Sequence, residues 1–147
     1  EFEMGQLLAE LEEEVLSYFG SHHFIFKMNT NLTVVADYEK IGQVIQNFVS
    51  NAVKYSPPGS TIEVLCLKQD NLIKLSVKDE GIGINATDLP HLFERFYRAG
   101  DTKVRNVAGF GIGLYLSAEI ILRHGGKIWA ESTVDAGSTF SFSLPAS

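Results

Sequence analysis

Three polar side chains recur along one predicted helix at a spacing that places them on the same face. Asn47, Asn51 and Lys54 stand at positions i, i+4 and i+7, and at about 100° per residue their side chains share one narrow stripe. An amide oxygen is a hard ligand that suits Mg²⁺, and a lysine ammonium neutralises phosphate. Taken alone, the stripe is better explained as the solvated edge of an amphipathic helix, because motifs this short recur by chance.

A carboxylate and two glycines follow directly after a predicted strand, in the sequence Asp-Glu-Gly-Ile-Gly-Ile at 79–84. Gly81 and Gly83 would allow a sharp turn and the close approach of a flat ligand to the backbone. An ionised carboxylate such as Asp79 only accepts hydrogen bonds, so it suits the exocyclic amine of adenine. Guanine carries an oxygen there, and two acceptors facing each other would cost about 1–3 kcal/mol. By itself, the segment is explained more simply as an ordinary Asp-x-Gly turn.

Glycines also alternate at the predicted start of a helix, at Gly109, Gly111 and Gly113. Bare backbone N–H groups and the partial positive charge of a helix N-terminus together favour phosphate. The spacing matches neither the P-loop pattern nor the G-x-G-x-x-G pattern of dinucleotide folds. Tight helix packing would explain one of these glycines but hardly three, so a phosphate cradle is the better explanation. A further segment, Gly-Ser-Thr-Phe at 137–140, indicates a tight turn into an edge strand and has no specificity by itself.

The elements that must position these residues follow from the hydrophobic periodicity. The pattern predicts an α+β fold, a two-layer sandwich with one mostly antiparallel mixed sheet and helices on one of its faces. The helix over 38–55 is the most clearly marked, because its apolar residues recur at helical spacing, Asp37 can cap its start and a Pro-Pro-Gly turn ends it. Residues 98–112 show no period and are predicted to form a loop. The other predicted elements are helices over 6–19, 87–97 and 113–124 and strands over 24–28, 32–36, 61–68, 72–78, 127–132 and 138–144.

Length, composition and charge limit the class of protein. The chain has 147 residues, of which 45% are hydrophobic and 20% charged, as expected for one globular domain. Residues 1–20 hold six glutamates and no Lys or Arg, and the rest of the chain balances twelve acidic against twelve basic residues. Without a basic face, nucleic-acid binding is not expected. The single cysteine, Cys66, excludes an internal disulfide and fits a reducing compartment. No apolar run approaches the ~20 residues of a membrane helix. We therefore expect a cytoplasmic domain without direct membrane contact.

The order of the motifs is more specific than any one of them. Along the chain, Asn-x-x-x-Asn-Ala-x-Lys-Tyr is followed by Asp-x-Gly-x-Gly, Phe-x-x-Phe, Gly-x-Gly-x-Gly-Leu and Gly-Ser-Thr-Phe. This series resembles the catalytic ATP-binding domain of sensor histidine kinases, and the resemblance covers nearly the whole chain, residues 5–145. It implies the Bergerat-type ATP-binding fold shared by gyrase, heat-shock chaperones, histidine kinases and MutL-type ATPases, with ATP and Mg²⁺ as ligands.

The resemblance also implies roles for individual residues. Asn51 would coordinate Mg²⁺ between the phosphates, with Asn47 beside it and Lys54 near the phosphates, and these three form the expected catalytic set. Tyr55 would lie along the adenine and ribose, and Asp79 would bind the adenine amine. The other residues expected to contact the nucleotide are Gly81, Gly83, Ile84, Phe93, Phe96, Lys103, Arg105, Gly109, Gly111, Gly113, Leu114 and Thr139.

Several of these residues belong to a mobile lid that the resemblance implies over residues 97–110. The aromatic pair Phe93 and Phe96 would anchor the lid, and Lys103 and Arg105 are its candidate cations for phosphate. The alternating glycines would hold phosphate where the lid becomes helix. Thr139 would support the base or a water molecule bound to it.

Asn47 separates this chain from related ATPases. Gyrase-type ATPases and heat-shock chaperones carry a glutamate four residues before the metal-binding asparagine, where it can act as a general base that activates water. An amide cannot take a proton near neutral pH, so hydrolysis is disfavoured and transfer to another nucleophile is favoured. The alternatives are a degenerate nucleotide-binding regulatory module without phosphotransfer and a gyrase-type hydrolytic ATPase.

None of the four histidines stands where a phosphoacceptor would. An acceptor histidine lies on a helix and precedes an acidic residue, which fits neither His22, His23, His91 nor His124. His124 is instead predicted to end a helix, where a partly charged imidazole would favour the helix dipole. We therefore expect residues 1–147 to form one monomeric catalytic domain that lacks the dimerisation and phosphoacceptor domain. Its expected partners are a response regulator and a histidine-bearing dimerisation domain, which would lie in the same parent protein or act in trans. A membrane anchor in the parent protein is compatible with this expectation.

Overall fold

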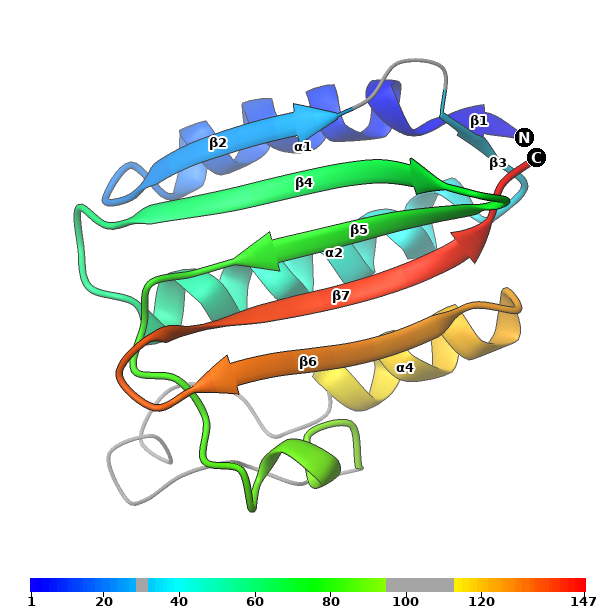
Figure 1. Cartoon of the computed structure of the whole chain (residues 1–147). Coiled ribbons are helices and arrows are strands. Elements are labelled where there is room, and N and C mark those ends of the chain that lie inside the picture. The colour runs from blue at the N-terminus through cyan, green and yellow to red at the C-terminus, as the bar shows by residue number, and fades with distance from the viewer. Residues whose placement is uncertain (29–31, 95–112) are drawn as a thin grey trace.

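Five of the described strands form one mixed sheet, the α-helices cover one of its faces, and two short strands form a separate small sheet (Figure 1). The computed structural model describes residues 1–28, 32–94 and 113–147. The elements are β1 (Phe2–Glu3), α1 (Met4–Tyr18), β2 (His23–Met28), β3 (Thr33–Val34), α2 (Tyr38–Tyr55), β4 (Thr61–Gln69), β5 (Leu72–Lys78), the 3₁₀ helix η1 (Leu89–His91), α4 (Gly113–Arg123), β6 (Lys127–Thr133) and β7 (Gly137–Pro145). The sheet order is β2-β4-β5-β7-β6, in which β2 and β4 run parallel and the other neighbours antiparallel. This arrangement confirms the predicted two-layer α/β sandwich.

The core lies between the sheet and α2. Val64, Val77 and Phe140 occupy neighbouring strands at the same level of the sheet, and none of them is more than 7% exposed. The ring of Phe48 on α2 packs against this layer, with its centroid 5.6 Å from that of Phe140 and 6.2 Å from that of Phe142. Since successive strand residues point to opposite faces, this packing fixes which residues of each strand face the helices.

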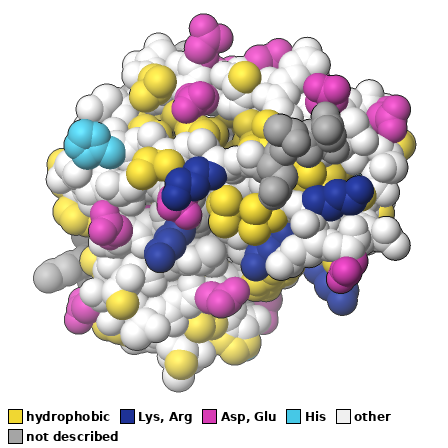
Figure 2. Space-filling view, turned by 45° about the horizontal axis from the view of Figure 1, so that its top comes forward, with side chains coloured by type: hydrophobic (Ala, Val, Ile, Leu, Met, Phe, Trp, Pro, Cys, Tyr) yellow, Lys and Arg dark blue, Asp and Glu magenta, His cyan; other side chains and the backbone are white. Residues whose placement is uncertain are grey.

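None of the described helices covers the opposite face of the sheet (Figure 1). On this open face, Lys74 Nζ lies 5.5 Å from the ring centroid of Trp129, and Lys27 pairs with Glu63 at 3.6 Å. Figure 2, tilted from the view of Figure 1, shows Lys and Arg side chains beside hydrophobic ones, with carboxylates between and around them. The part of this face that is described therefore carries both signs of charge, unlike the uniformly basic surface of a nucleic-acid binder.

Two of the helices agree closely with their predicted ranges. α2 spans the predicted residues, and Asp37 Oδ1 caps its first turn by accepting from the backbone N of Lys40 at 3.1 Å. α4 ends one residue before the predicted end of its helix. In the described ranges of the chain, no helix is both long and apolar enough to cross a membrane.

Two local predictions differ from the structure. The sequence predicts a helix over 87–97, but in the described part of this range the structure has only the three-residue 3₁₀ helix η1. The reason is that a residue that precedes proline, as Leu89 does, disfavours helical backbone. Residues 95–97 lie outside the described ranges. The small sheet of β1 and β3, in which Phe2 pairs with Val34, is not predicted as such. Strands of two residues are too short to show an alternating pattern.

His124 joins the end of α4 to the start of α2. Its Nδ1 lies 2.7 Å from the carbonyl oxygen of Ile120, and its Nε2 accepts a hydrogen bond from the backbone N of Asp37 at 3.1 Å. The two ring nitrogens thus connect the last turn of α4 to the residue that precedes α2. His124 directly follows the last residue of α4, so its predicted place at the end of a helix is confirmed.

We predict that His124→Ala lowers the free energy of unfolding by about 0.5–1.5 kcal/mol, because the Asp37 N–H loses its acceptor at the start of α2. Urea denaturation of the two proteins gives this difference. His23→Ala is the control, since His23 is exposed at the start of β2, and should change stability by less than about 0.5 kcal/mol. Equal losses in the two variants would contradict the assigned contact.

Candidate functional site

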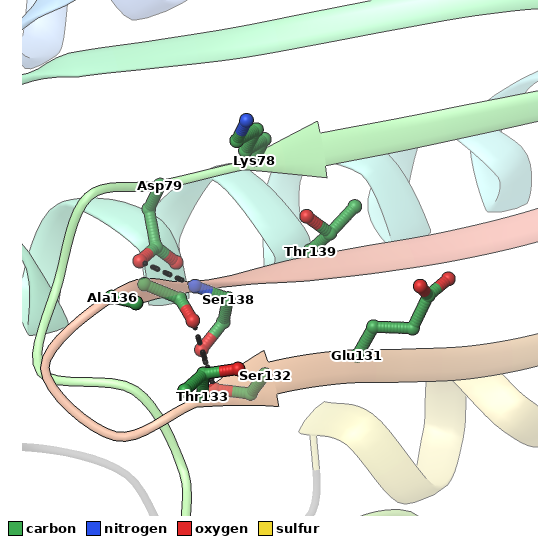
Figure 3. A pocket seen from close by; sticks show the side chains of 9 residues that line it. Lys78, Asp79, Glu131, Ser132, Thr133, Ala136, Ser138 and Thr139 are labelled. Atoms are coloured by element: carbon green, nitrogen blue, oxygen red, sulfur yellow. Dashed lines mark hydrogen bonds between the residues drawn. The ribbon is translucent and has the colours of Figure 1, made fainter.

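A buried carboxylate lies where β5 ends. Asp79 is only 4% exposed, and its Oδ1 accepts hydrogen bonds from the backbone N of Gly81 at 2.8 Å and of Ser138 at 3.2 Å. The backbone N of Asp79 in turn donates to the carbonyl oxygen of Ser138 at 2.9 Å. Figure 3 shows the carboxylate directed toward Ser138 at the start of β7. Because both of these side-chain bonds use Oδ1, Oδ2 is the oxygen suited to accept from a ligand.

Burial gives this carboxyl group an unusual acidity. Desolvation raises the pKa of Asp79 above its ordinary value, and the hydrogen bonds from Gly81 and Ser138 oppose that shift because they stabilise the ionised form. A carboxyl group whose pKa is raised by burial at the edge of a fold is a candidate for ligand binding.

Glycine is required in the turn that follows Asp79. A Cβ at Gly81 would lie 2.2 Å from the carbonyl oxygen of Tyr55, and one at Gly83 would lie 2.1 Å from that of Thr133. The φ angle of Gly83 is +75°, which side chains disfavour. The turn therefore fits closely between the end of α2 and the hairpin that joins β6 to β7.

The C-terminal part of α2 approaches both the Asp79 turn and α4. The carbonyl oxygen of Tyr55 accepts from the backbone N of Ile82 at 3.1 Å. Asn51 lies about one helical turn before Tyr55, and Asn47 lies one turn before Asn51. Both asparagines are half-buried, while Lys54 is exposed. The predicted stripe on α2 thus exists, and it begins beside α4 and ends beside the Asp79 turn.

Asn47 forms the contact with α4. Its Nδ2 donates to the carbonyl oxygen of Gly113 at 2.9 Å and to Ser117 Oγ at 3.2 Å. Gly113, the last of the three alternating glycines, is the first residue of α4. The structure thus brings together two motifs that are 66 residues apart in the sequence.

Three other predicted residues lie around this region. The backbone N of Ile84 donates to Ser132 Oγ at 2.7 Å. The ring of Phe93 packs edge-on against Phe140, with centroids 6.4 Å apart. Leu114 is half-buried and packs against the core. The side chains of all three are partly buried and pack against the hydrophobic core.

Thr139 does not lie beside the Asp79 carboxylate. It pairs with Lys78 across β5 and β7, and both point to the open face, since Val77 and Phe140 point to the helices. The residue that contacts Asp79 is Ser138, which is 7% exposed and whose Oγ lies 2.8 Å from Ser132 Oγ. The alternation along β7 could have identified Ser138, because it is separated by an even number of residues from Phe140 and Phe142 and so faces the same side of the sheet.

An open cavity of about 180 Å³ lies at the same end of the sheet and is lined by residues of β5, β6 and β7 and of their turns. Among its lining side chains, Lys78, Glu131 and Thr139 are on the open face of the sheet (Figure 3). The predicted residues of α2 are on the other face. Asp79 and Ser138 also line this cavity, so it adjoins the region between Asp79, α2 and α4.

Much of the predicted lid lies outside the residues that the structure describes. This holds for the following predicted site residues: Phe96, Lys103, Arg105, Gly109 and Gly111. Within residues 1–28, 32–94 and 113–147, no group of three or more His, Cys, Asp or Glu side chains could hold a metal ion. Among the described residues of α2, Asn47 and Asn51 carry side-chain amide oxygens, which can ligate Mg²⁺.

Comparison with known proteins agrees with this geometry. The profile of the family described as histidine kinase-, DNA gyrase B- and HSP90-like ATPases matches residues 36–147. The sensor histidine kinase WalK of Bacillus subtilis (strain 168) is 44% identical over 117 residues, which cover 78% of this chain and 19% of WalK. The chain thus spans about a fifth of the length of this relative.

Solved structures of histidine kinases share the fold. The mycobacterial sensor histidine kinase MprB superposes with a TM-score of 0.86 at 26% identity, over 99% of this chain and 95% of that one. The histidine kinase ThkA, in a complex with the response regulator protein TrrA, superposes with a TM-score of 0.79 at 27% identity, over 99% of this chain and 41% of that one.

The raised pKa of Asp79 predicts a specific dependence of stability on pH. Between about 3.9, the value in an unfolded chain, and the higher folded value, the folded chain binds more protons than the unfolded one. The contribution of Asp79 to the free energy of unfolding of the chain should therefore increase as the pH falls through that window. Asp79→Asn keeps an acceptor oxygen but does not titrate, so it serves as the reference.

Urea denaturation of both proteins from neutral pH to about pH 4 tests this dependence. We expect the wild-type chain to gain stability relative to Asp79→Asn as the pH falls. Parallel curves, or a relative loss by the wild type, would contradict the assigned environment.

Proposed function

The chain belongs to the family of histidine kinase-, DNA gyrase B- and HSP90-like ATPases, and we propose that it is the ATP-binding catalytic domain of a sensor histidine kinase. In this proposal it holds Mg-ATP for transfer of the γ-phosphate to a histidine on a separate dimerisation domain. The observation that carries the proposal is the buried Asp79 carboxylate, held by two backbone amides where α2, β5 and β7 meet.

The adenine binds at Asp79 on the helix side of the sheet. The carboxylate accepts from the exocyclic amine, and a guanine oxygen in the same place would face a second acceptor. Ser138 takes the supporting place that the resemblance gives to Thr139, because Ser138 is the residue on the same face as Asp79. Tyr55 lies at the end of α2 nearest to this turn and borders the base.

The phosphates lie along α2 toward the start of α4. Asn51 and Lys54 share the stripe that begins at Asn47, next to Gly113 at the helix N-terminus. A side-chain amide oxygen such as that of Asn51 is a suitable ligand for Mg²⁺, which keeps several waters and uses substrate phosphates for the rest of its shell. When bound, Mg²⁺ supplies neutralisation of the phosphate charge. Lys103, Arg105, Gly109 and Gly111 complete the phosphate contacts in this proposal.

Asn47 favours transfer over hydrolysis. Both hydrogens of its amide point to α4, and an amide has no basic nitrogen that could take a proton from water. Catalysis by this chain is then placement and charge neutralisation, which is how phosphoryl transfer is generally accelerated.

The proposed partners follow from the length of the chain. It spans 19% of WalK, so the histidine-bearing dimerisation domain is proposed to lie elsewhere in a parent protein, or to be reached in trans. A response regulator, as in the ThkA–TrrA complex, would then receive the phosphate. Residues 1–147 are proposed to act as one catalytic domain, monomeric by itself and located on the cytoplasmic side.

We predict that the chain binds Mg-ATP and discriminates against Mg-GTP. Asp79→Asn should weaken ATP binding by about tenfold or more and narrow the preference over GTP, because the variant loses the charge and gains a donor that guanine can use. Calorimetric titration measures both affinities. Glu131→Gln is the matched control, since it removes a carboxylate near the same end of the sheet but on the open face, and it should bind ATP like the wild type.

The outcomes of this titration separate the alternatives. Absence of ATP binding at millimolar ligand would refute the proposal and leave a regulatory module of the same fold. ATP and GTP binding with equal affinity would show that Asp79 does not contact the base. An equal loss in the Glu131→Gln variant would show that the nucleotide also contacts the open face of the sheet.

We also predict that γ-labelled Mg-ATP transfers its label to the histidine of a cognate dimerisation domain added in trans, with little release of phosphate by the chain alone. The physical reason is that Asn47 positions but cannot deprotonate water. Gel autoradiography and a phosphate-release assay measure the two products. Rapid, steady release of phosphate without the acceptor domain would favour the gyrase-type hydrolase instead.

A further inference from the structure

We propose that Ser117 is a positioning residue, whose hydroxyl fixes the side-chain amide of Asn47 and so holds the first turn of α4 against α2. No motif of the sequence marks Ser117. The inference rests on the proposed function, in which that turn of α4 borders the phosphates of ATP.

The contacts of Asn47 define the orientation of its amide. Nδ2 carries two hydrogens, and it lies 2.9 Å from the Gly113 carbonyl oxygen and 3.2 Å from Ser117 Oγ. The opposite orientation would set Oδ1 against the Gly113 carbonyl, so that two acceptors would face each other. Both amide donors are thus committed to α4, and only the side-chain oxygen can be offered to a ligand.

The Asn47 amide also lies close to the backbone at the start of α4. A Cβ at Gly113 would lie 3.0 Å from Asn47 Oδ1 and 3.1 Å from Nδ2, so the backbone of α4 approaches the amide as closely as glycine allows. Ser117 is 1% exposed, and solvent water therefore does not replace its hydroxyl at Nδ2. Removing the hydroxyl leaves a half-buried donor without its acceptor.

The location of the contact gives it a role beyond stability. Gly113 begins α4 at the end of the glycine-rich segment, and Asn47 lies one turn before the proposed metal ligand Asn51 on α2. A shift of the Asn47 amide changes both the position of the helix start and the position of the side-chain oxygen. We therefore expect the affinity for Mg-ATP to depend on Ser117 although its hydroxyl does not touch the nucleotide.

Ser117→Ala tests this inference, with Ser76→Ala as the matched control. Ser76 is also buried, and its Oγ forms one side-chain hydrogen bond, of 3.0 Å to Ser141 Oγ, on the open face of the sheet. Both variants should lower Tm by about 2–5 °C. In calorimetric titration, Ser117→Ala should weaken Mg-ATP binding about three- to tenfold, while Ser76→Ala should bind like the wild type.

A spectroscopic readout distinguishes positioning from general loss of stability. The two side-chain amide protons of Asn47 give separate NMR signals because the amide C–N bond rotates slowly, and in the wild-type chain both should exchange slowly with solvent because each donates to α4. In Ser117→Cys the volume is nearly kept but the acceptor is weak, so one of the two signals should move and exchange faster. This variant also serves if Ser117→Ala fails to fold.

The results have separate consequences for the two proposals. If the wild-type chain does not bind Mg-ATP, the proposed function fails. If it binds, the inference about Ser117 is overturned when the Ser117 variants bind Mg-ATP like the wild type, when Ser76→Ala loses as much affinity, or when the Asn47 signals are unchanged in Ser117→Cys.

Discussion

The structure depends on keeping one carboxylate, Asp79, ionisable and nearly out of solvent at the end of a strand. A buried charge is unfavourable unless donors compensate it, and here the donors are the backbone N–H groups of Gly81 and Ser138. The first requires a turn so tight that a side chain at Gly81 would meet the Tyr55 carbonyl. The second requires β7 to start beside the end of β5. The glycine motif and the strand order therefore serve the same carboxylate.

A second constraint connects this carboxylate to the other end of the proposed site. α2 reaches the Asp79 turn through the Tyr55 carbonyl and reaches α4 through the Asn47 amide. Its apolar face packs in the core through Phe48. The two ends of the proposed nucleotide site are therefore connected by one helix that is anchored in the core. The cap between Asp37 and His124 fixes the start of the same helix, so α2 is held at both ends.

The sequence predicts those features that follow from local periodicity. α2 has the predicted bounds because apolar spacing, a capping Asp37 and a proline turn agree with one another. The same kind of reasoning fails for β1, which is too short to show a period. The resemblance assigns the role beside the base to Thr139, whereas the geometry brings Ser138 to Asp79, and the alternation along β7 contains that information. The contacts of His124 and Ser117 are formed between segments far apart in the chain, and neither residue carries a local signal for its partner.

An NMR titration of the intact chain with Mg-ATP tests the central claim, that the nucleotide binds at Asp79 on the helix side of the sheet. The account predicts large shifts of the backbone amide signals of Gly81 and Ser138, which donate to the carboxylate. The indole signal of Trp129, whose N–H donates to Glu131 on the open face, should not move. Movement of the Trp129 signal, with Gly81 and Ser138 unchanged, would contradict the account and place the ligand on the open face.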